Sequence, residues 1–240
     1  HEKGYPYGAV LEYLATIANS NYEQWRTENP DEPLESFDFK LKNMSKTGAL
    51  FDLAKLTDIS KTYISRLTAD EVYESAVLWA KEYDSDFYET LVNDSDYAKA
   101  VFGIERGNQK PRKDIEKWAD TVEYTRYFYE RPTKREYPEG QEKEDIKAIL
   151  ENYCALYSPE DSQEEWFEKI RGMSEELGYA KAPKIYKKNP ESYKGHVGDV
   201  STIIRVAVTG RKNTPDMHQI LKVLGKDEVI KRLDEAIKTL

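Results

Sequence analysis

Apolar residues recur at intervals of three and four positions along almost the whole chain. From Ala9 to Ala18 this spacing places one apolar face on a helix, and from Thr68 to Tyr83 it does so again. The second segment opens with a capping box, because the Thr68 hydroxyl can accept an amide hydrogen bond while Glu71 reaches back to the cap. No run of strands with alternating apolar and polar residues is evident. The spacing predicts an all-α fold.

The same spacing, together with capping and terminating residues, predicts where further helices begin and end. The expected elements are helices over Asp96–Glu105 and Lys113–Tyr129, a helix beginning at Ser158 and Pro159 and ending before Gly178, a helix capped by Asp199 and ended by Gly210, a helix capped by Thr214 and begun by Pro215, and a last helix after Gly225.

A change in composition predicts a break in the chain. Residues 129–145 contain two prolines, one glycine and many charged residues without helical spacing. We therefore expect two helical subdomains over residues 1–130 and 145–240, joined by a linker over residues 131–144.

Composition excludes several classes of protein. The hydrophobic content is 39%, and no apolar run approaches the roughly 20 residues of a membrane span. The first ten residues lack the apolar core of a secretory signal. Cys154 is the single cysteine, so an internal disulfide is excluded, and with three scattered histidines it leaves no zinc site. The expectation is a cytoplasmic chain without a metal and without membrane contact.

Basic residues are concentrated in short segments. The formal net charge is -9, so binding of a nucleic acid would depend on local patches. Such patches occur at Arg106–Lys113, Arg131–Arg135 and Lys181–Lys188. Solvated loops are the alternative interpretation of each patch.

The segment Ile203–Gly225, "IIRVAVTGRKNTPDMHQILKVLG", combines a buried helix pattern with a basic turn. Arg205 lies at the edge of the apolar face, and the helix after the turn offers amides and a positive dipole end to an anion. An arginine, the Thr214 hydroxyl and a helix N-terminus at one elbow can hold a phosphate or a base edge. The alternative is a surface salt bridge for Arg205 and an ordinary cap at Thr214.

The C-terminal residues resemble bacterial glutamyl-tRNA synthetases. The family pattern of a Leu-Arg-x-Ala-Leu-Thr-Gly helix, a proline turn and a Leu-Leu-Gly-Lys helix is matched by Ile204–Gly210 and Val223–Lys226, followed by Arg232 and Leu233. Gly48–Ile64 resembles the family's Phe-Asp-x-x-Lys-Leu segment, and "GYPYGAVLEYL" with "TGALFDL" suggests the clostridial branch.

The catalytic signatures of that family have no counterpart in this sequence. No His-x-Gly-His motif or βαβ pattern occurs, and "KNMSKT" at Lys42–Thr47 imitates the family's KMSKS loop but leads straight into the Phe51-Asp52 segment. The resemblance therefore implies a tRNA-binding C-terminal portion that is not catalytic by itself. ATP and Mg²⁺ are expected to belong to the missing catalytic domain, and no cofactor to this chain.

The resemblance also implies an α-helical cage that reads the anticodon, as in class I aminoacyl-tRNA synthetases. The residues expected at anticodon bases are Arg205, Thr214, Met217, Lys110 and Arg112, and those expected at the tRNA backbone are Arg106, Lys181, Lys184, Lys187, Arg211 and Lys212, with Lys55 and Lys61 as weaker candidates. The expected partner is the glutamate-accepting tRNA, with the glutamine-accepting tRNA left open, and neither DNA nor a membrane. A helical protein-interaction module without RNA binding is the alternative function, and a small intact enzyme is the less favoured one.

Overall fold

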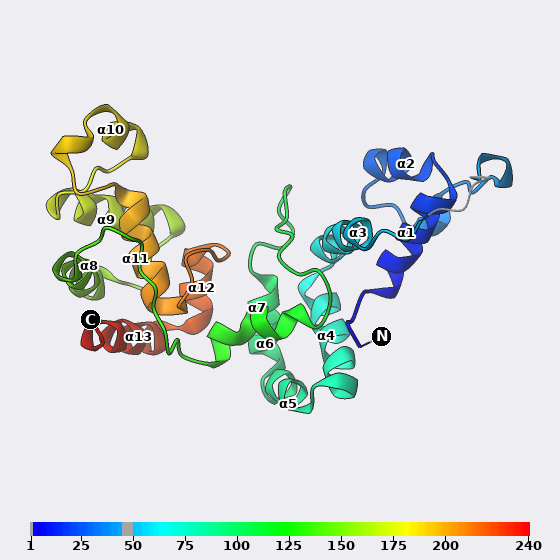
Figure 1. Cartoon of the computed structure of the whole chain (residues 1–240). Coiled ribbons are helices and arrows are strands. Elements are labelled where there is room, and N and C mark those ends of the chain that lie inside the picture. Colours follow the sequence, from blue (N-terminus) through cyan, green and yellow to red (C-terminus); the bar gives the residue numbers. More distant parts are fainter. Residues whose placement is uncertain (1, 45–49) are drawn as a thin grey trace. The chain divides into compact units, whose positions relative to one another are not determined.

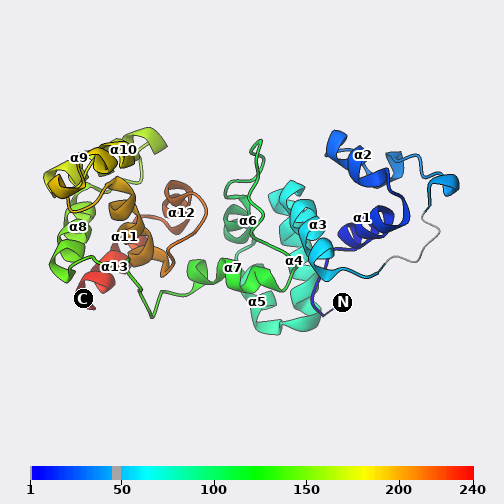
Figure 2. The same cartoon turned by 45° about the horizontal axis from the view of Figure 1, so that its top comes forward.

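The computed structural model describes residues 2–44 and 50–240, and within those ranges every regular element is a helix (Figures 1 and 2). The all-α prediction is confirmed. The "KNMSKT" segment and the start of Gly48–Ile64 lie partly outside the described residues. The chain divides into two compact units, His1–Thr125 and Arg126–Leu240.

The first unit packs short helices around an apolar centre supplied mainly by α4, α5 and α6. Its core contains Val72, Ala76, Leu91 and Phe102, to which Trp118 adds its ring. The helices, in chain order, are α1 (Tyr7–Ala18), α2 (Tyr22–Glu28), α3 (Leu53–Arg66), α4 (Ala69–Tyr83), α5 (Ser85–Asn93), α6 (Ser95–Gly103) and α7 (Asp120–Tyr129), which runs into the second unit, with single 3-10 turns η1 (Leu34–Ser36) and η2 (Leu41–Asn43).

The second unit is built around α11, which contacts α8, α9 and α13. Its helices are α8 (Lys143–Leu156), α9 (Gln163–Glu176), α10 (Pro183–Lys188), α11 (Val197–Thr209), α12 (Met217–Leu224) and α13 (Lys226–Lys238), with the 3-10 turn η3 (Pro190–Ser192). Because α11 carries β-branched and small apolar residues on most of its surface, it can be covered on several sides at once. Ile203, Ile204 and Ala207 have no exposed surface.

The helix predicted over Lys113–Tyr129 is shorter than expected. It begins at Asp120. The residues before it use their amides elsewhere: Trp118 donates to the Gly4 carbonyl oxygen at 2.8 Å, and Glu116 donates to the Asp120 carboxylate at 3.2 Å. Ile115 and Trp118 are buried, but they lie in an irregular segment.

Three predicted helix starts are displaced by a few residues. The α9 helix is capped by Ser162 rather than begun at Ser158, and α11 is capped by His196 rather than by Asp199. In each case a carboxylate three residues after the cap completes a capping box. Asp199, predicted as the cap of α11, is this third residue of the motif. The α12 helix is capped by Asp216 and not by Thr214. The capping box of Thr68 and Glu71 is confirmed.

The segment predicted as a linker makes ordered contacts within the second unit. Arg131 pairs with Glu228 and Glu235 of α13, and Arg135 donates to the Ala207 carbonyl oxygen of α11 at 2.9 Å. We call residues 130–137 the strap. The subdomain boundaries at residues 130 and 145 stay a prediction.

Candidate nucleic-acid interface

Arg205 lies half-buried on α11 between the fully buried Ile204 and Val206. Its Nη1 atom is 3.5 Å from the carbonyl oxygen of Lys212, in the turn after the helix. The arginine therefore reaches from the helix to the basic turn. We call residues 209–216, between α11 and α12, the elbow.

The elbow is fixed at its first residues by Thr209 and Gly210. The Thr209 hydroxyl donates to the Arg205 carbonyl oxygen at 2.7 Å and accepts from the Arg211 amide at 3.2 Å. Gly210 adopts the left-handed conformation, with φ of 73°. A Cβ atom at Gly210 would lie 3.0 Å from the Pro132 Cβ and 3.1 Å from the Lys134 carbonyl oxygen. Glycine is therefore required both by the backbone and by the strap.

Thr214 and Met217 are buried, in contrast to Lys212, which is exposed. The Thr214 hydroxyl donates to the Pro215 carbonyl oxygen at 3.0 Å. Asp216 accepts from the Gln219 amide at 2.9 Å through one carboxylate oxygen. The start of α12 therefore already holds a negative charge. The helix begins after Asp216 and not at Pro215 as predicted, and the Asp216 carboxylate disfavours an anion at this helix end.

Arg211 lies over an aromatic ring. Its guanidinium carbon is 5.0 Å from the centroid of the Tyr127 ring, which belongs to the C-terminal half of α7. Such cation–π contacts hold a guanidinium in one orientation. Tyr127 is buried. The structure nevertheless brings it to the elbow as a support.

A cluster of charged residues, one of which is Arg131 of the second basic patch, anchors the C-terminal end of α11. Arg232 is 1% exposed and donates to the carbonyl oxygens of Tyr127 at 2.5 Å and Val208 at 3.0 Å. Glu228 accepts from both Arg232 and Arg131. The Arg131 hydrogen bond, with help from Arg232, lowers the pKa of Glu228 to about 2. These contacts satisfy carbonyl groups that a helix end leaves unpaired.

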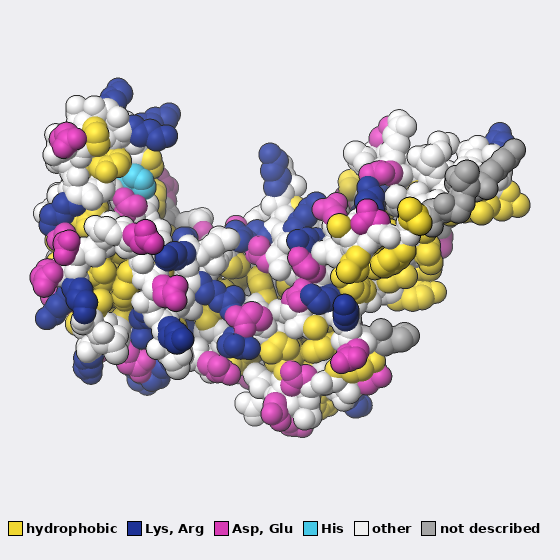
Figure 3. Space-filling view, in the orientation of Figure 1, with side chains coloured by type: hydrophobic (Ala, Val, Ile, Leu, Met, Phe, Trp, Pro, Cys, Tyr) yellow, Lys and Arg dark blue, Asp and Glu magenta, His cyan; other side chains and the backbone are white. Residues whose placement is uncertain are grey.

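The basic patch of the first unit falls between α6 and α7, where the chain projects as a loop (Figure 1). Lys110 is exposed in this loop, and Lys and Arg side chains stand at its outer end (Figure 3). Arg112 is held by Asp114, with N–O distances of 2.5 Å and 3.1 Å, and this hydrogen bond raises the pKa of Arg112. Arg112 is therefore oriented before any ligand arrives.

Arg106 serves a different purpose from its neighbours. Its guanidinium donates to the carbonyl oxygens of Phe102 at 2.7 Å, Ile64 at 2.8 Å and Leu67 at 3.1 Å. Burial lowers the pKa of this group. Arg106 thus ties the ends of α3 and α6 together at the base of the basic loop.

The third patch is partly helical. Pro183 begins the short helix α10, which exposes Lys184 and Lys187, whereas Lys181 lies 3.2 Å from the Glu175 carboxylate. The weaker candidates are also paired, Lys55 with Glu23 and Lys61 with Glu116.

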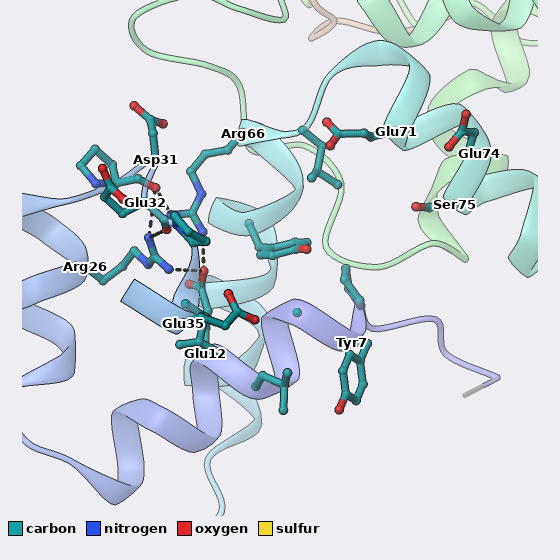
Figure 4. Close-up of a pocket in the computed structure, with 18 of the residues that line it drawn as sticks. Tyr7, Glu12, Arg26, Asp31, Glu32, Glu35, Arg66, Glu71, Glu74 and Ser75 are labelled. Atoms are coloured by element: carbon teal, nitrogen blue, oxygen red, sulfur yellow. Dashed lines mark hydrogen bonds and ion pairs between the residues drawn. The ribbon is translucent and has the colours of Figure 1, made fainter. Parts of the chain in front are cut away.

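A cleft of about 780 Å³ in the first unit contains none of the predicted site residues (Figure 4). At its floor Glu12 accepts from Arg66 at 2.8 Å and pairs with Arg26 at 3.1 Å. Its rim carries the carboxylates of Asp31, Glu32, Glu35, Glu71 and Glu74. An acidic rim repels phosphate, so this cleft is unsuited to RNA.

Among the described residues, no group of three or more His, Cys, Asp and Glu side chains could hold a metal ion. Burial raises the pKa of the Cys154 thiol to about 11, which keeps it protonated near neutral pH. Within the same part of the chain, no helix is long and apolar enough to cross a membrane.

The sequence pattern of the anticodon binding domain matches residues 71–237. The chain belongs to this family of helical anticodon-binding domains. The match includes all three basic patches and the elbow, and it disfavours the alternative of a protein-interaction module.

Within that class, the chain is similar to glutamate–tRNA ligases. It is 43% identical to the Acetivibrio thermocellus ligase over 236 residues, which cover 98% of this chain and 43% of the relative. It is 42% identical to the Clostridium perfringens ligase over 238 residues, which cover 97% of this chain and 44% of the relative. The resemblance to the clostridial branch is confirmed. The chain spans less than half the length of these relatives.

The fold has a counterpart among solved structures. A glutamate tRNA ligase from Elizabethkingia meningosepticum, solved in complex with its amino acid, superposes with a TM-score of 0.62 at 17% identity. The superposition covers 99% of this chain and 42% of that chain. This likeness shows a shared fold.

Proposed function

We propose that this chain binds tRNA and reads its anticodon as the C-terminal part of a glutamate–tRNA ligase. The observation that carries the proposal is the family match over residues 71–237, which includes Arg205 and the elbow it braces. The names of the Acetivibrio thermocellus and Clostridium perfringens relatives support the glutamate-accepting tRNA as the partner.

Arg205 is proposed to read a base edge at the elbow. Its guanidinium is held between a buried helix and the Lys212 carbonyl, so little side-chain freedom is lost when an unstacked base docks. A paired hydrogen bond from arginine to a base contributes about 1–3 kcal/mol of discrimination. Thr214 and Met217 are both buried beneath the elbow. They are proposed to support the elbow and to contact a base only through their small exposed part.

The loop of the first unit is proposed to supply a second contact with the anticodon. Lys110 offers an exposed charge, and Arg112 would exchange its hydrogen bonds with Asp114 for those of a base. Arg106, which donates to three backbone carbonyls, contributes by fixing the base of the loop.

Basic residues at two places are proposed to contact phosphates. Lys181, Lys184 and Lys187 form one group around α10, and Arg211 with Lys212 forms the other at the elbow. Such contacts increase affinity and weaken with salt, but they carry no sequence information.

The chain itself is not proposed to catalyse a reaction. Attachment of glutamate, with its ATP and Mg²⁺, is assigned to the portion of the relatives that this chain does not match. A cytoplasmic location, and the absence of DNA and membrane partners, are parts of the same proposal.

The test is titration of the chain with glutamate tRNA, with the same tRNA altered at single anticodon bases, and with glutamine tRNA, over a range of salt. Arg205→Ala is compared with Lys222→Ala, which removes an exposed cation from α12. We expect an altered base and Arg205→Ala each to cost about 1–3 kcal/mol at fixed salt, and Lys222→Ala to cost less than either.

Binding that is equal for every anticodon and declines smoothly with salt would contradict base reading by Arg205. Absence of tRNA binding would contradict the proposed function altogether. Equal affinity for glutamate and glutamine tRNA would indicate that the third anticodon base is not discriminated.

A further inference from the structure

Exposed apolar side chains are concentrated near the start of the first unit. Eight large ones fall between residues 7 and 53, against three in the other described residues. The eight are Tyr7, Leu14, Phe39, Leu41, Met44, Leu50, Phe51 and Leu53. We call them the apolar face, and Figure 3 shows hydrophobic side chains gathered over this end of the unit.

The α1 helix buries its charged residue and exposes large apolar residues, which is the reverse of an ordinary surface helix. Its one charged residue, Glu12, is 6% exposed and is paired with Arg26 and Arg66, whereas Tyr7 is 77% exposed and Leu14 is 48% exposed. Residues seven apart lie on one face of a helix, and in Figure 4 Tyr7 points away from the ion pairs of Glu12. A helix surface of this kind is normally covered by another protein surface.

The segments that carry the other members are attached to the same helix. The Tyr13 ring meets the Phe51 ring edge-on at a centroid distance of 5.6 Å, and the Tyr13 hydroxyl accepts from the Asp52 amide at 2.7 Å. Asn19, which follows α1, forms a backbone bridge with Met44. These contacts place Phe51 and Met44 beside α1, the helix that carries Tyr7 and Leu14.

The neighbouring cleft indicates the charge of the partner. Tyr7 and Leu11 line one wall, and carboxylates including Glu35 and Glu71 stand at the rim. The two arginines of the cleft are engaged by Glu12 and by backbone carbonyls, so the rim presents negative charge. The fitting partner is an apolar protein surface bordered by lysines or arginines, and not a nucleic acid.

We propose that the apolar face docks the part of a glutamate–tRNA ligase that this chain does not match. The face lies in residues 7–53, outside the anticodon-binding match at 71–237. In the Acetivibrio thermocellus relative, 43% of the length corresponds to this chain, so more than half of that polypeptide remains to cover the face. The proposal rests on the family assignment and is independent of tRNA binding.

The test compares the chain alone with a chimeric ligase in which it replaces its counterpart in the Acetivibrio thermocellus enzyme. In a Cys154→Ser background, Leu41→Cys reports on the apolar face and Leu78→Cys is the control, since these leucines are 77% and 70% exposed. We expect maleimide labelling of Leu41→Cys to be at least tenfold slower in the chimera than in the chain alone, with Leu78→Cys changed less than twofold.

Equal labelling of Leu41→Cys in the two proteins would overturn the proposal. Slow labelling of Leu41→Cys in the chain alone, together with a dimer in sedimentation velocity, would show instead that a second copy covers the face. As a second measurement, the unmatched part of the ligase is expressed separately. Tyr7→Glu with Leu41→Glu should weaken its association with this chain at least tenfold, and Leu78→Glu less than twofold. Equal effects would also overturn the proposal, and tRNA titration of the same variants tests the proposed function separately.

Discussion

Arg232 of α13 donates a hydrogen bond from Nη1 to the carbonyl oxygen of Val208, in the last turn of α11, at 3.0 Å. The same nitrogen donates to the Tyr127 carbonyl oxygen, and the Tyr127 ring supports Arg211 of the elbow. One buried guanidinium therefore joins α7, α11 and α13 at the position where the elbow leaves α11. The proposed base-reading surface is built on this joint.

Replacing Arg232 with methionine should destabilise the second unit by about 3 kcal/mol, because it leaves two buried carbonyl groups without their charged donor and removes one of the two arginines that pair with Glu228. Urea unfolding measures the change. Arg171→Met is the control, since Arg171 forms an exposed i,i+3 pair with Glu168 and should cost at most about 1 kcal/mol. Equal destabilisation by the two variants would show that Arg232 contributes no more than a surface arginine.

Glu228 should make the stability of the chain depend on pH. Its pKa is lowered to about 2, mainly by the Arg131 hydrogen bond, whereas an unfolded glutamate titrates near 4.3. The stabilisation is therefore present above about pH 5 and is lost as pH falls from about 4 to 2. The difference in unfolding free energy between wild type and Glu228→Gln should shrink over that interval. A difference for Glu228→Gln that stays constant over that interval would contradict the assignment.

Two glycines should respond oppositely to substitution by alanine. Gly210→Ala should cost at least about 1–2 kcal/mol, because φ is 73° there and the new Cβ meets Pro132 and Lys134. Gly172→Ala, inside α9 with nothing within 4 Å of its Cβ, should stabilise by about 0.5–1 kcal/mol. Urea unfolding of both variants checks the pair, and a neutral Gly210→Ala would exclude the strap as a constraint on the elbow.

The lysines of α10 should affect tRNA affinity without affecting specificity. Lys184→Ala with Lys187→Ala should lower affinity for every anticodon variant by the same factor. The slope of log affinity against log salt should fall by about 0.7 for each phosphate that the protein no longer neutralises. Lys147→Ala, which breaks an exposed pair with Glu151 on α8, is the control and should leave the slope unchanged. A change in anticodon preference would contradict the phosphate assignment.

The helices themselves could be predicted from the sequence, and several of their ends could not. Val200, Ile203 and Ala207 repeat at helical spacing, and Gly210 adopts the predicted terminating conformation. The start of α11 was misplaced because Asp199 can act either as a cap or as the third residue of a capping box, and only the observed hydrogen bond to the His196 amide distinguishes the two. The start of α7 was misplaced because the Trp118 amide bonds to Gly4, more than a hundred residues away.

The sequence by itself determined that the chain is helical, that its basic residues gather in loops, and that its C-terminal pattern belongs to glutamyl-tRNA synthetases. Those properties depend on local spacing and on motifs of neighbouring residues. Tertiary structure decided which charges face outward: Arg106 and Arg232 bond to distant carbonyls, whereas Lys110 and Lys184 remain exposed. It also buried Glu12 and exposed Tyr7 on one short helix. The physical reason is that a buried charge needs a hydrogen-bond partner, and here that partner comes from a helix far away in the sequence. The spacing of neighbouring residues therefore does not predict which charges are buried.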